Sequence, residues 1–260
     1  MVRGFYEAAS GVLAQQRNFN VISNNIANVT TTGYKAEGVV GSSFAEHLVA
    51  RIGDGPIFPR RSIGPATFFT TNIDEYTDFT QGNIENTGRD LDVALVGNGF
   101  FMIDSESKGE ILTRNGQFSV DSDMNLVLPG VGLVLDDGGS PITLDSSNIT
   151  VDESGGIRYV DTEGEESAEE VARLGVYVAE DESALENAGQ GFYRSEQMPD
   201  VAPAGSYRVA QYAIEKSNVN MAMEMSRVMA GQNQYNACTQ VVKMYDQLNE
   251  ALVTQIGRVS

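Results

Sequence analysis

The sequence contains little of what catalysis or metal binding needs: one cysteine, one histidine and no tryptophan in 260 residues. A single cysteine excludes an internal disulfide framework and a multi-cysteine metal site. A single histidine leaves little material for acid–base chemistry near neutral pH. We therefore expect no catalytic residues, no metal site and no cofactor.

Long hydrophobic runs are also missing. No stretch approaches the roughly 20 apolar residues that a membrane-spanning helix needs. Glu7 stands where the apolar core of a secretory signal peptide would begin. We therefore expect neither direct membrane insertion nor a secretory signal peptide.

Positive charge is scarce, with 17 Lys and Arg against 36 Asp and Glu, a formal net charge of −19. Residues 121–200 hold 19 of the acids against three arginines, whereas the first 40 and the last 50 residues are close to neutral. This balance repels nucleic acid and anionic lipid surfaces. We expect protein partners, bound by packing through the neutral ends, and no nucleic acid.

All seven prolines lie between Pro56 and Pro203, so neither end contains a helix breaker. Near the C-terminus, a stripe of apolar and small residues repeats every three or four positions and predicts one helix over about residues 219–258. That stripe consists of Met225, Val228, Gln232, Tyr235, Cys238, Val242, Tyr245, Leu248, Leu252, Ile256 and Val259.

A shorter stripe near the N-terminus predicts a second helix. It consists of Phe5, Ala9, Val12, Phe19, Ile22, Ile26 and Val29. Gly33 fits the position just after the helix end, with Tyr34 packing back on the last turn.

The middle of the chain has a different period. From Leu91 to about Tyr193, short β-rich runs are separated by Gly, Asn and Asp at intervals of about 8–12 residues, which is typical of an all-β domain. Residues 53–86 contain three prolines and several glycines and predict an extended connector. Residues 161–170 predict a solvated acidic loop.

The predicted fold class is therefore α+β, with long terminal helices forming a coiled-coil-like α domain and an all-β domain inserted between them. The predicted domains are an N-terminal helix (1–35), an extended connector (36–86), a β-rich domain (87–205) and a C-terminal helix (206–260). The apolar stripes need burial. Either the helices pair with each other and with neighbouring copies, or they fold back as a hairpin onto the β domain, and the pattern leaves both open.

Several motifs, in order along the chain, resemble the flagellar rod and hook family. Residues 23–35 read SNNIANVTTTGYK, residues 87–95 TGRDLDVAL, residues 97–101 GNGFF, residues 113–118 TRNGQF and residues 217–220 SNVN, followed by Tyr235 and Asp246. The chain departs from the family pattern at Thr32, often proline, and at Met124, a turn position often held by glycine. Asn233, Asn236 and Cys238 also differ from the residues common around the helix tyrosine.

The resemblance implies a non-enzymatic structural subunit of the bacterial flagellar basal-body rod. Such subunits leave the cell through the flagellar type III export apparatus and polymerise into a hollow axial tube that transmits torque. Their terminal helices form the inner tube and the β domain its outer sleeve. The implied partners are copies of the chain and other rod and hook proteins. Residues 87–92 look most like the proximal rod proteins, with the distal rod proteins as the close alternative.

We expect the assembly interface on the two helical stripes and their asparagines: Phe5, Val12, Phe19, Ile22, Asn25, Ile26, Asn28, Met225, Val228, Tyr235, Val242, Tyr245, Leu252 and Ile256. Asparagines are poor helix formers, so the N-terminal helix should be marginal alone. They either fix the register between subunits or are ordinary polar face residues.

Two functions of other classes remain as alternatives. One is a secreted β-rich binding module whose helices form a dimerisation stalk. The other is an exported hydrolase of the cell wall, which would need two carboxylates facing each other across a cleft. Asp121, Asp123 and Asn125 resemble the start of a calcium loop, but Leu126 stands where the loop needs glycine.

Overall fold

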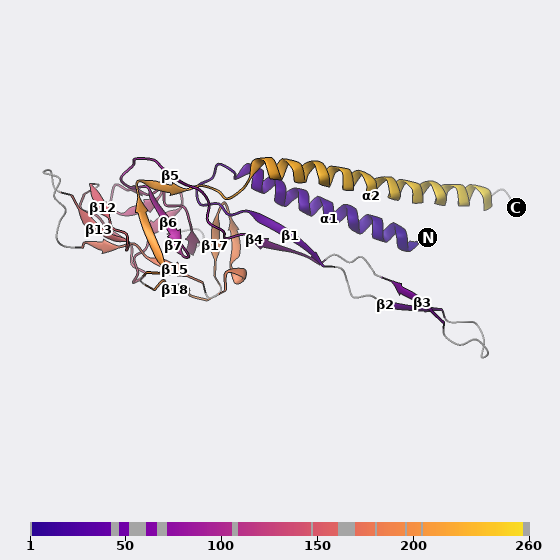
Figure 1. Ribbon diagram of the computed structural model, residues 1–260, viewed down its shortest axis with the longest axis horizontal. Coiled ribbons are helices and arrows are strands. Elements are labelled where there is room, and N and C mark those ends of the chain that lie inside the picture. Colours follow the sequence, from indigo (N-terminus) through magenta and orange to yellow (C-terminus); the bar gives the residue numbers. More distant parts are fainter. Residues whose placement is uncertain are drawn as a thin grey trace. The chain divides into compact units, whose positions relative to one another are not determined.

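The computed structural model describes residues 2–42, 47–51, 61–66, 72–105, 109–146, 148–160, 170–179, 181–195, 197–203 and 205–256. A helix lies at each end of the chain, with a β-rich region between them in the sequence (Figure 1), so the α+β class is confirmed. The chain divides into two compact units. The first holds residues 1–24, 37–76 and 221–260, and the second holds residues 25–36 and 77–220.

The two helices agree with the apolar periodicity to within a few residues. Helix α1 spans Val2–Ala27 and helix α2 spans Met221–Ile256. At 1.5 Å per residue, the 36 residues of α2 extend over about 54 Å. Within the described part of the chain, neither helix combines the length and the apolar character that crossing a membrane requires.

The first unit also contains two β-ribbons from the segment predicted as a connector. Strand β1 (Glu37–Ser42) pairs with β4 (Asn72–Thr77), and β2 (His47–Arg51) pairs with β3 (Arg61–Ala66). The sequence analysis predicts extended backbone here but not its pairing, because prolines and glycines indicate turns without indicating which segments meet.

The second unit is built around a nine-stranded sheet with the order β16-β17-β8-β7-β11-β10-β9, to which β15 adds on β7 and β18 on β15. Its strands are β7 (Phe100–Ser105), β8 (Gly109–Thr113), β9 (Ser119–Val120), β10 (Leu126–Leu128), β11 (Gly132–Val134), β15 (Val176–Val178), β16 (Glu186–Gly189), β17 (Phe192–Arg194) and β18 (Asp200–Val201). The 3-10 helix η1 spans Glu182–Ala184.

Three smaller sheets complete this unit. One joins β12 (Ile149–Val151), β13 (Gly156–Tyr159) and β14 (Ala172–Arg173). The second pairs β6 (Val93–Gly97) with β19 (Tyr207–Gln211), and the third pairs β5 (Ile84–Asn86) with β20 (Ala213–Glu215).

Residues 100–103 of strand β7 are buried on both faces, which is why this part of its sequence is continuously apolar rather than alternating. Phe101 and Ile103 belong to the main hydrophobic cluster, where the Phe101 ring meets Phe118 edge-on at 5.3 Å. Phe100 and Met102 belong to a second cluster on the opposite face. The sheet is therefore a core layer covered on both sides.

The structure differs from the sequence analysis in two β segments. A short β-rich run at residues 142–144 of the sequence predicts a strand, but the structure has only isolated bridges here, Asn125 to Thr143 and, just before the run, Leu135 to Pro141. Proline has no N–H with which to continue a ladder at Pro141. Residues 207–215, grouped above with the C-terminal helix, form β19 and β20. The apolar residues Val209 and Ala213 lie four apart, a spacing that also fits a helix. The predicted acidic loop lies outside the described residues except for Glu170.

Candidate assembly interface

The two helices of the first unit lie side by side and run in opposite directions (Figure 1). Gly4 lies against the Tyr245 ring, and Gly11 lies against the Cys238 sulfur. Gln15 Nε2 donates a hydrogen bond to Gln234 Oε1 at 2.8 Å. Residue numbers rise on one helix as they fall on the other, which defines an antiparallel pair.

Small residues at the seam explain how closely the helices approach. A Cβ atom on Gly4 would overlap the Tyr245 ring, and one on Gly231 would lie 3.1 Å from the Phe19 ring. The Phe19 and Tyr235 rings meet edge-on with centroids 6.3 Å apart. Glycine inside a helix lowers helix stability by about 1 kcal/mol relative to alanine. Here the close contact between the two helices offsets that loss.

Pairing with α1 leaves much of the apolar surface of α2 exposed. Met229 is 64% exposed, Met244 60% and Val253 72%. The other large exposed hydrophobic residues of this helix are Met221, Met223, Met225, Val241, Leu248 and Leu252. Large apolar side chains left exposed along one helix in this number are typical of an interaction site.

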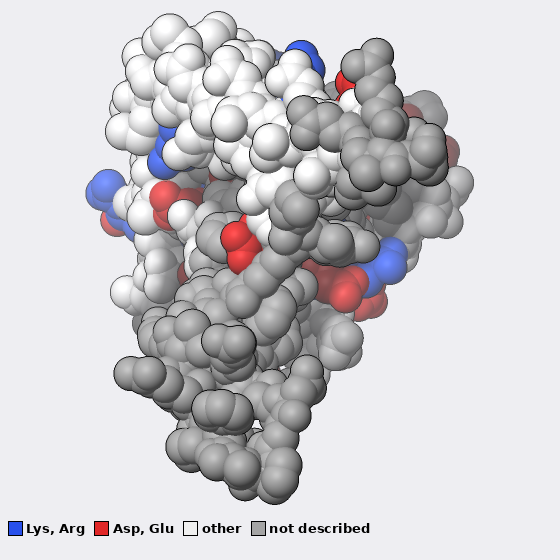
Figure 2. Space-filling model, turned by 90° about the vertical axis from the view of Figure 1, so that its right-hand side faces the viewer, with Lys and Arg blue, Asp and Glu red and all other residues white. Residues whose placement is uncertain are grey.

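The C-terminal part of α2 extends past its partner helix. Gly4, in the first turn of α1, already lies opposite Tyr245, so residues beyond about 248 have no described α1 residue facing them. Leu252 in this overhang is 38% exposed. Figure 2, viewed toward the helix ends, shows mostly uncharged atoms among the described residues of its upper part. Among the described residues, no part of α1 covers the apolar side chains of the overhang, which include Leu252 and Val253.

The structure separates the predicted interface residues into groups. Ile22 and Asn25 are buried, and Met225 and Leu252 are exposed. The half-buried residues are Phe5, Val12, Phe19, Ile26, Asn28, Val228, Tyr235, Val242 and Tyr245. Ile256 is the last residue of α2, and its side chain lies outside the described part.

Several exposed apolar residues of the helices were not predicted from the sequence: Leu13, Val241, Met244 and Val253. They lie off the single stripe that the three-and-four spacing selects. Apolar residues that recur on a second face of a helix, beside the first stripe, are the sequence signal that could have identified them.

The segment after α1 is anchored within the second unit. Asn25 is fully buried, and its Oδ1 accepts a hydrogen bond from the Tyr34 hydroxyl at 3.2 Å. Gly33 N donates to the Glu215 carbonyl at 2.8 Å. Helix α1 ends at Ala27, earlier than Gly33 predicts, and turns follow because threonine and asparagine favour local backbone bonds over a helix.

A buried ion network ties this segment to β20. Lys35 Nζ donates to Glu215 Oε1 at 2.7 Å and to the Thr80 carbonyl at 2.8 Å. Arg114 Nη1 reaches Glu215 Oε2 at 3.4 Å, and Gly82 N donates to Glu215 Oε1 at 2.8 Å. All three charged side chains are almost fully buried.

The network is sensitive to the loss of any member. Desolvation lowers the pKa of Lys35 and of Arg114, and the nearby Glu215 carboxylate counteracts this in both cases. Arg114 also lies over the Phe100 ring at 5.1 Å. Because burial is the larger effect, the two cations depend on Glu215 for compensation.

Gly33 offers a direct test of this anchor. Its φ is +71°, and an added Cβ would lie 2.5 Å from the backbone of Arg114 and Asn115. Gly88 has the same φ with open space around it. Gly88→Ala should cost about 1–2 kcal/mol of unfolding free energy from left-handed strain. Gly33→Ala should cost at least about 1 kcal/mol more, because overpacking adds to the strain.

Urea unfolding of both variants followed by circular dichroism measures this difference. Equal losses for the two alanine variants would contradict the close approach of Gly33 to residues 114–115.

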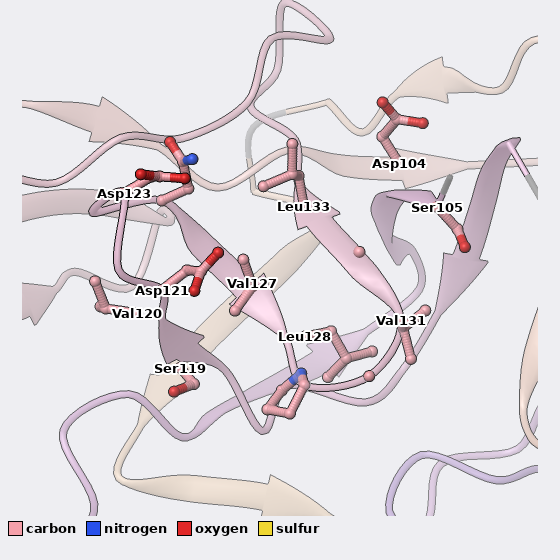
Figure 3. Close-up of a pocket in the computed structure, with 14 residues that line it drawn as sticks. Asp104, Ser105, Ser119, Val120, Asp121, Asp123, Val127, Leu128, Val131 and Leu133 are labelled. Atoms are coloured by element: carbon pink, nitrogen blue, oxygen red, sulfur yellow. The ribbon is translucent and has the colours of Figure 1, made fainter. Parts of the chain in front are cut away.

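A cavity of about 780 Å³ lies on the β10–β11 hairpin of the second unit. Figure 3 shows Asp104 on the far side of Leu133 from Asp121 and Asp123. Met124, in the adjacent turn, has a φ of +62°, as expected for a position often held by glycine. No group of three or more His, Cys, Asp or Glu side chains suited to a metal ion occurs in the described part.

A β-rich unit between two terminal helices whose outer face stays apolar is typical of a structural subunit that associates through its ends. Three family models match the chain in order. They are a flagella basal body rod protein model at residues 5–35, a flagellar hook protein FlgE/F/G D1 domain at residues 94–159, and a flagellar basal body rod FlgEFG protein C-terminal model at residues 210–256. Together they cover more than half of the chain.

Curated relatives match over nearly their whole length. The flagellar basal-body rod protein FlgF of Caulobacter vibrioides is 28% identical over 100% of both chains. FlgG of Buchnera aphidicola is 28% identical over 97% of this chain and 99% of its own. The hook-basal body complex protein FlhO of Bacillus subtilis is 28% identical over 100% of both chains. The chain belongs to the flagellar basal-body rod protein family.

Proposed function

We propose that the chain is a structural, non-enzymatic subunit of the bacterial flagellar basal-body rod, and that it polymerises through its terminal helices into an axial tube that transmits torque. The observation that carries this proposal is the apolar face of α2, which stays exposed after α1 has packed. Named relatives are rod or hook-basal body proteins. Relatives called FlgF and FlgG are equally similar, so the proximal position remains a prediction from residues 87–92.

The spacing of the seam supports coiled-coil-like packing. The buried and half-buried residues of α2 recur at alternating steps of four and three, the 3.5-residue period of a coiled coil. They are Glu224, Val228, Gly231, Tyr235, Cys238, Val242 and Tyr245, while Thr239, next to Cys238, is also half-buried and falls outside this spacing. We propose that neighbouring copies cover the remaining apolar faces in the same manner.

In this assembly the predicted domains have distinct roles. Helices α1 and α2 line the tube, residues 87–205 form the outer sleeve, and residues 36–86 connect them. Met225 and Leu252 are available to neighbours directly, because they are exposed. Asn25 acts through the Tyr34 hydroxyl, which holds the end of α1 in place. The partners are copies of this chain, other rod and hook proteins and, during export, the type III export apparatus. The assembled chain lies in the flagellar basal body, outside the cytoplasm.

Hydrogen exchange tests the proposal. In the purified monomer, amides of residues 248–256 should exchange within seconds, because the overhang lacks a packing partner. In the assembled state they should be protected at least about a hundredfold, since opening must then break intersubunit contacts. Amides of β7 serve as the control, because they should be protected in both states. Slow exchange of the overhang in the monomer would favour a helical hairpin already covered by its own chain.

A further inference from the structure

A second cavity, of about 280 Å³, lies within the first unit. Side chains from four elements line it: Asn18 of α1, Glu37 and Val39 of β1, Tyr76 of β4, and Glu224 and Arg227 of α2. Its volume is below the roughly 300–1,000 Å³ of small-molecule sites. The size fits one amino-acid side chain better than a cofactor.

Glu224 is the unusual member of this cavity. It is only 3% exposed. Its Oε1 accepts a hydrogen bond from Arg227 Nη1 at 2.7 Å, but its Oε2 is buried and has no partner among the described residues. Glu224 lies in the first turn of α2, where the helix dipole stabilises a carboxylate. The dipole does not supply Oε2 with a hydrogen-bond donor. Burying an unpaired acceptor is unfavourable, so a donor from outside the described contacts is expected.

The charge and shape of the cavity specify that donor. Arg227 already bonds Glu224 Oε1, so the acceptor that still needs a donor is the carboxylate oxygen Oε2, which a cationic donor complements. The Tyr76 ring lies across Gly38, where a Cβ atom would overlap it, and about half of the tyrosine side chain remains exposed. An aromatic face beside a carboxylate suits the alkyl stem and charged head of lysine or arginine.

Each copy of the chain also carries the complementary group. Arg17 of α1 and Lys243 of α2 are exposed. In the ranges that the structure describes, no ion pair joins either of them to a carboxylate. One type of subunit therefore presents both an unfilled acidic cavity and unpaired basic side chains.

We propose that this cavity, the Glu224 cavity, receives Arg17 or Lys243 of a neighbouring copy of the chain, whose charged head bonds Glu224 Oε2. The inference rests on the proposed function, since it requires copies to meet. It adds a specific polar contact to an interface that is otherwise apolar. Such a contact fixes the register between neighbours, which apolar surfaces alone leave loose.

Photo-crosslinking in the organism that encodes the chain tests the inference. A benzophenone amino acid replacing Tyr76 should yield a covalent dimer of this chain, with the crosslinked peptide containing Arg17 or Lys243. Glu224→Gln should reduce the yield at least about tenfold, because a charge-assisted hydrogen bond is lost. Glu110→Gln, an exposed change on β8 of the second unit, should leave the yield unchanged.

The unfolding midpoint of the Glu224→Gln monomer separates an intersubunit role from an internal one. It should change little, because Arg227 can still donate to the amide oxygen of the variant and one buried polar atom without a partner is exchanged for another. A fall in the midpoint that accounts for the lost yield would overturn the inference, as would crosslinks only to other proteins or none.

A second crosslinker at the exposed Met244 reports whether copies meet at all. If Met244 yields chain-to-chain dimers and Tyr76 does not, the Glu224 cavity is excluded while the proposed function stands. If neither position does, the proposed function fails as well.

Discussion

Replacing Leu252 by aspartate should abolish assembly and motility while leaving the monomer folded. Leu252 lies in the overhang of α2, is partly exposed in the single chain and has no α1 residue opposite it. A carboxylate there stays hydrated in the monomer. In a packed interface it loses that hydration at a cost of several kcal/mol. Soft-agar swarming and recovery of the chain in purified basal bodies measure the effect.

Two variants on the same helix sharpen this test. Gln247→Asp adds the same charge at an exposed position just before the overhang, and should have little effect. Val242→Asp places the charge at the half-buried seam, and should weaken helix pairing in the monomer as well. Motile cells carrying Leu252→Asp would count decisively against a tube built from these helices.

Among the variants proposed for this chain, those that break the buried ion network of the second unit should lose the most unfolding free energy. Glu215→Gln leaves Lys35 and Arg114 buried close together without their anion. Removing one partner of a buried pair costs about 3–5 kcal/mol. Lys35→Met should cost less, because Arg114 still compensates Glu215. Urea unfolding of the purified chain gives both values.

The neighbouring lysine provides a matched control. Lys216 pairs with Glu85 at the surface, where both side chains are about half exposed. Lys216→Met should change the unfolding free energy by no more than about 1 kcal/mol. The double variant of Lys35 and Glu215 should lose less than the sum of its single variants, since the two groups share one network. Additive losses would contradict that coupling.

The same network shows why part of the site was not predictable. Lys35 and Glu215 are 180 residues apart in the sequence, and nothing local distinguishes them from Lys216 or Glu85. Asn25 and Asn28 stand in similar sequence surroundings, yet Asn25 is fully buried and Asn28 is only half-buried. Burial of this kind is set by which distant segment packs on the residue.

The pairing of the strands could not be predicted from the sequence for a related reason. Short apolar runs between turn residues are local signals, and the runs at residues 126–128 and 149–151 predict two strands, which the structure shows as β10 and β12. The sequence does not predict that β7 lies between β8 and β11 or that β19 pairs with β6. Register depends on contacts between remote segments, which a single sequence does not display.

The sequence by itself determined the two terminal helices, the β-rich middle and the neutral, apolar character of the ends, because periodicity, proline placement and charge act over a few neighbouring residues. Only the tertiary structure decided which apolar residues α1 covers and which stay open. It also brought Glu224, Tyr76 and Asn18 around one cavity. The physical reason is that burial is a property of the residues that meet in space, and chain positions far apart supply them.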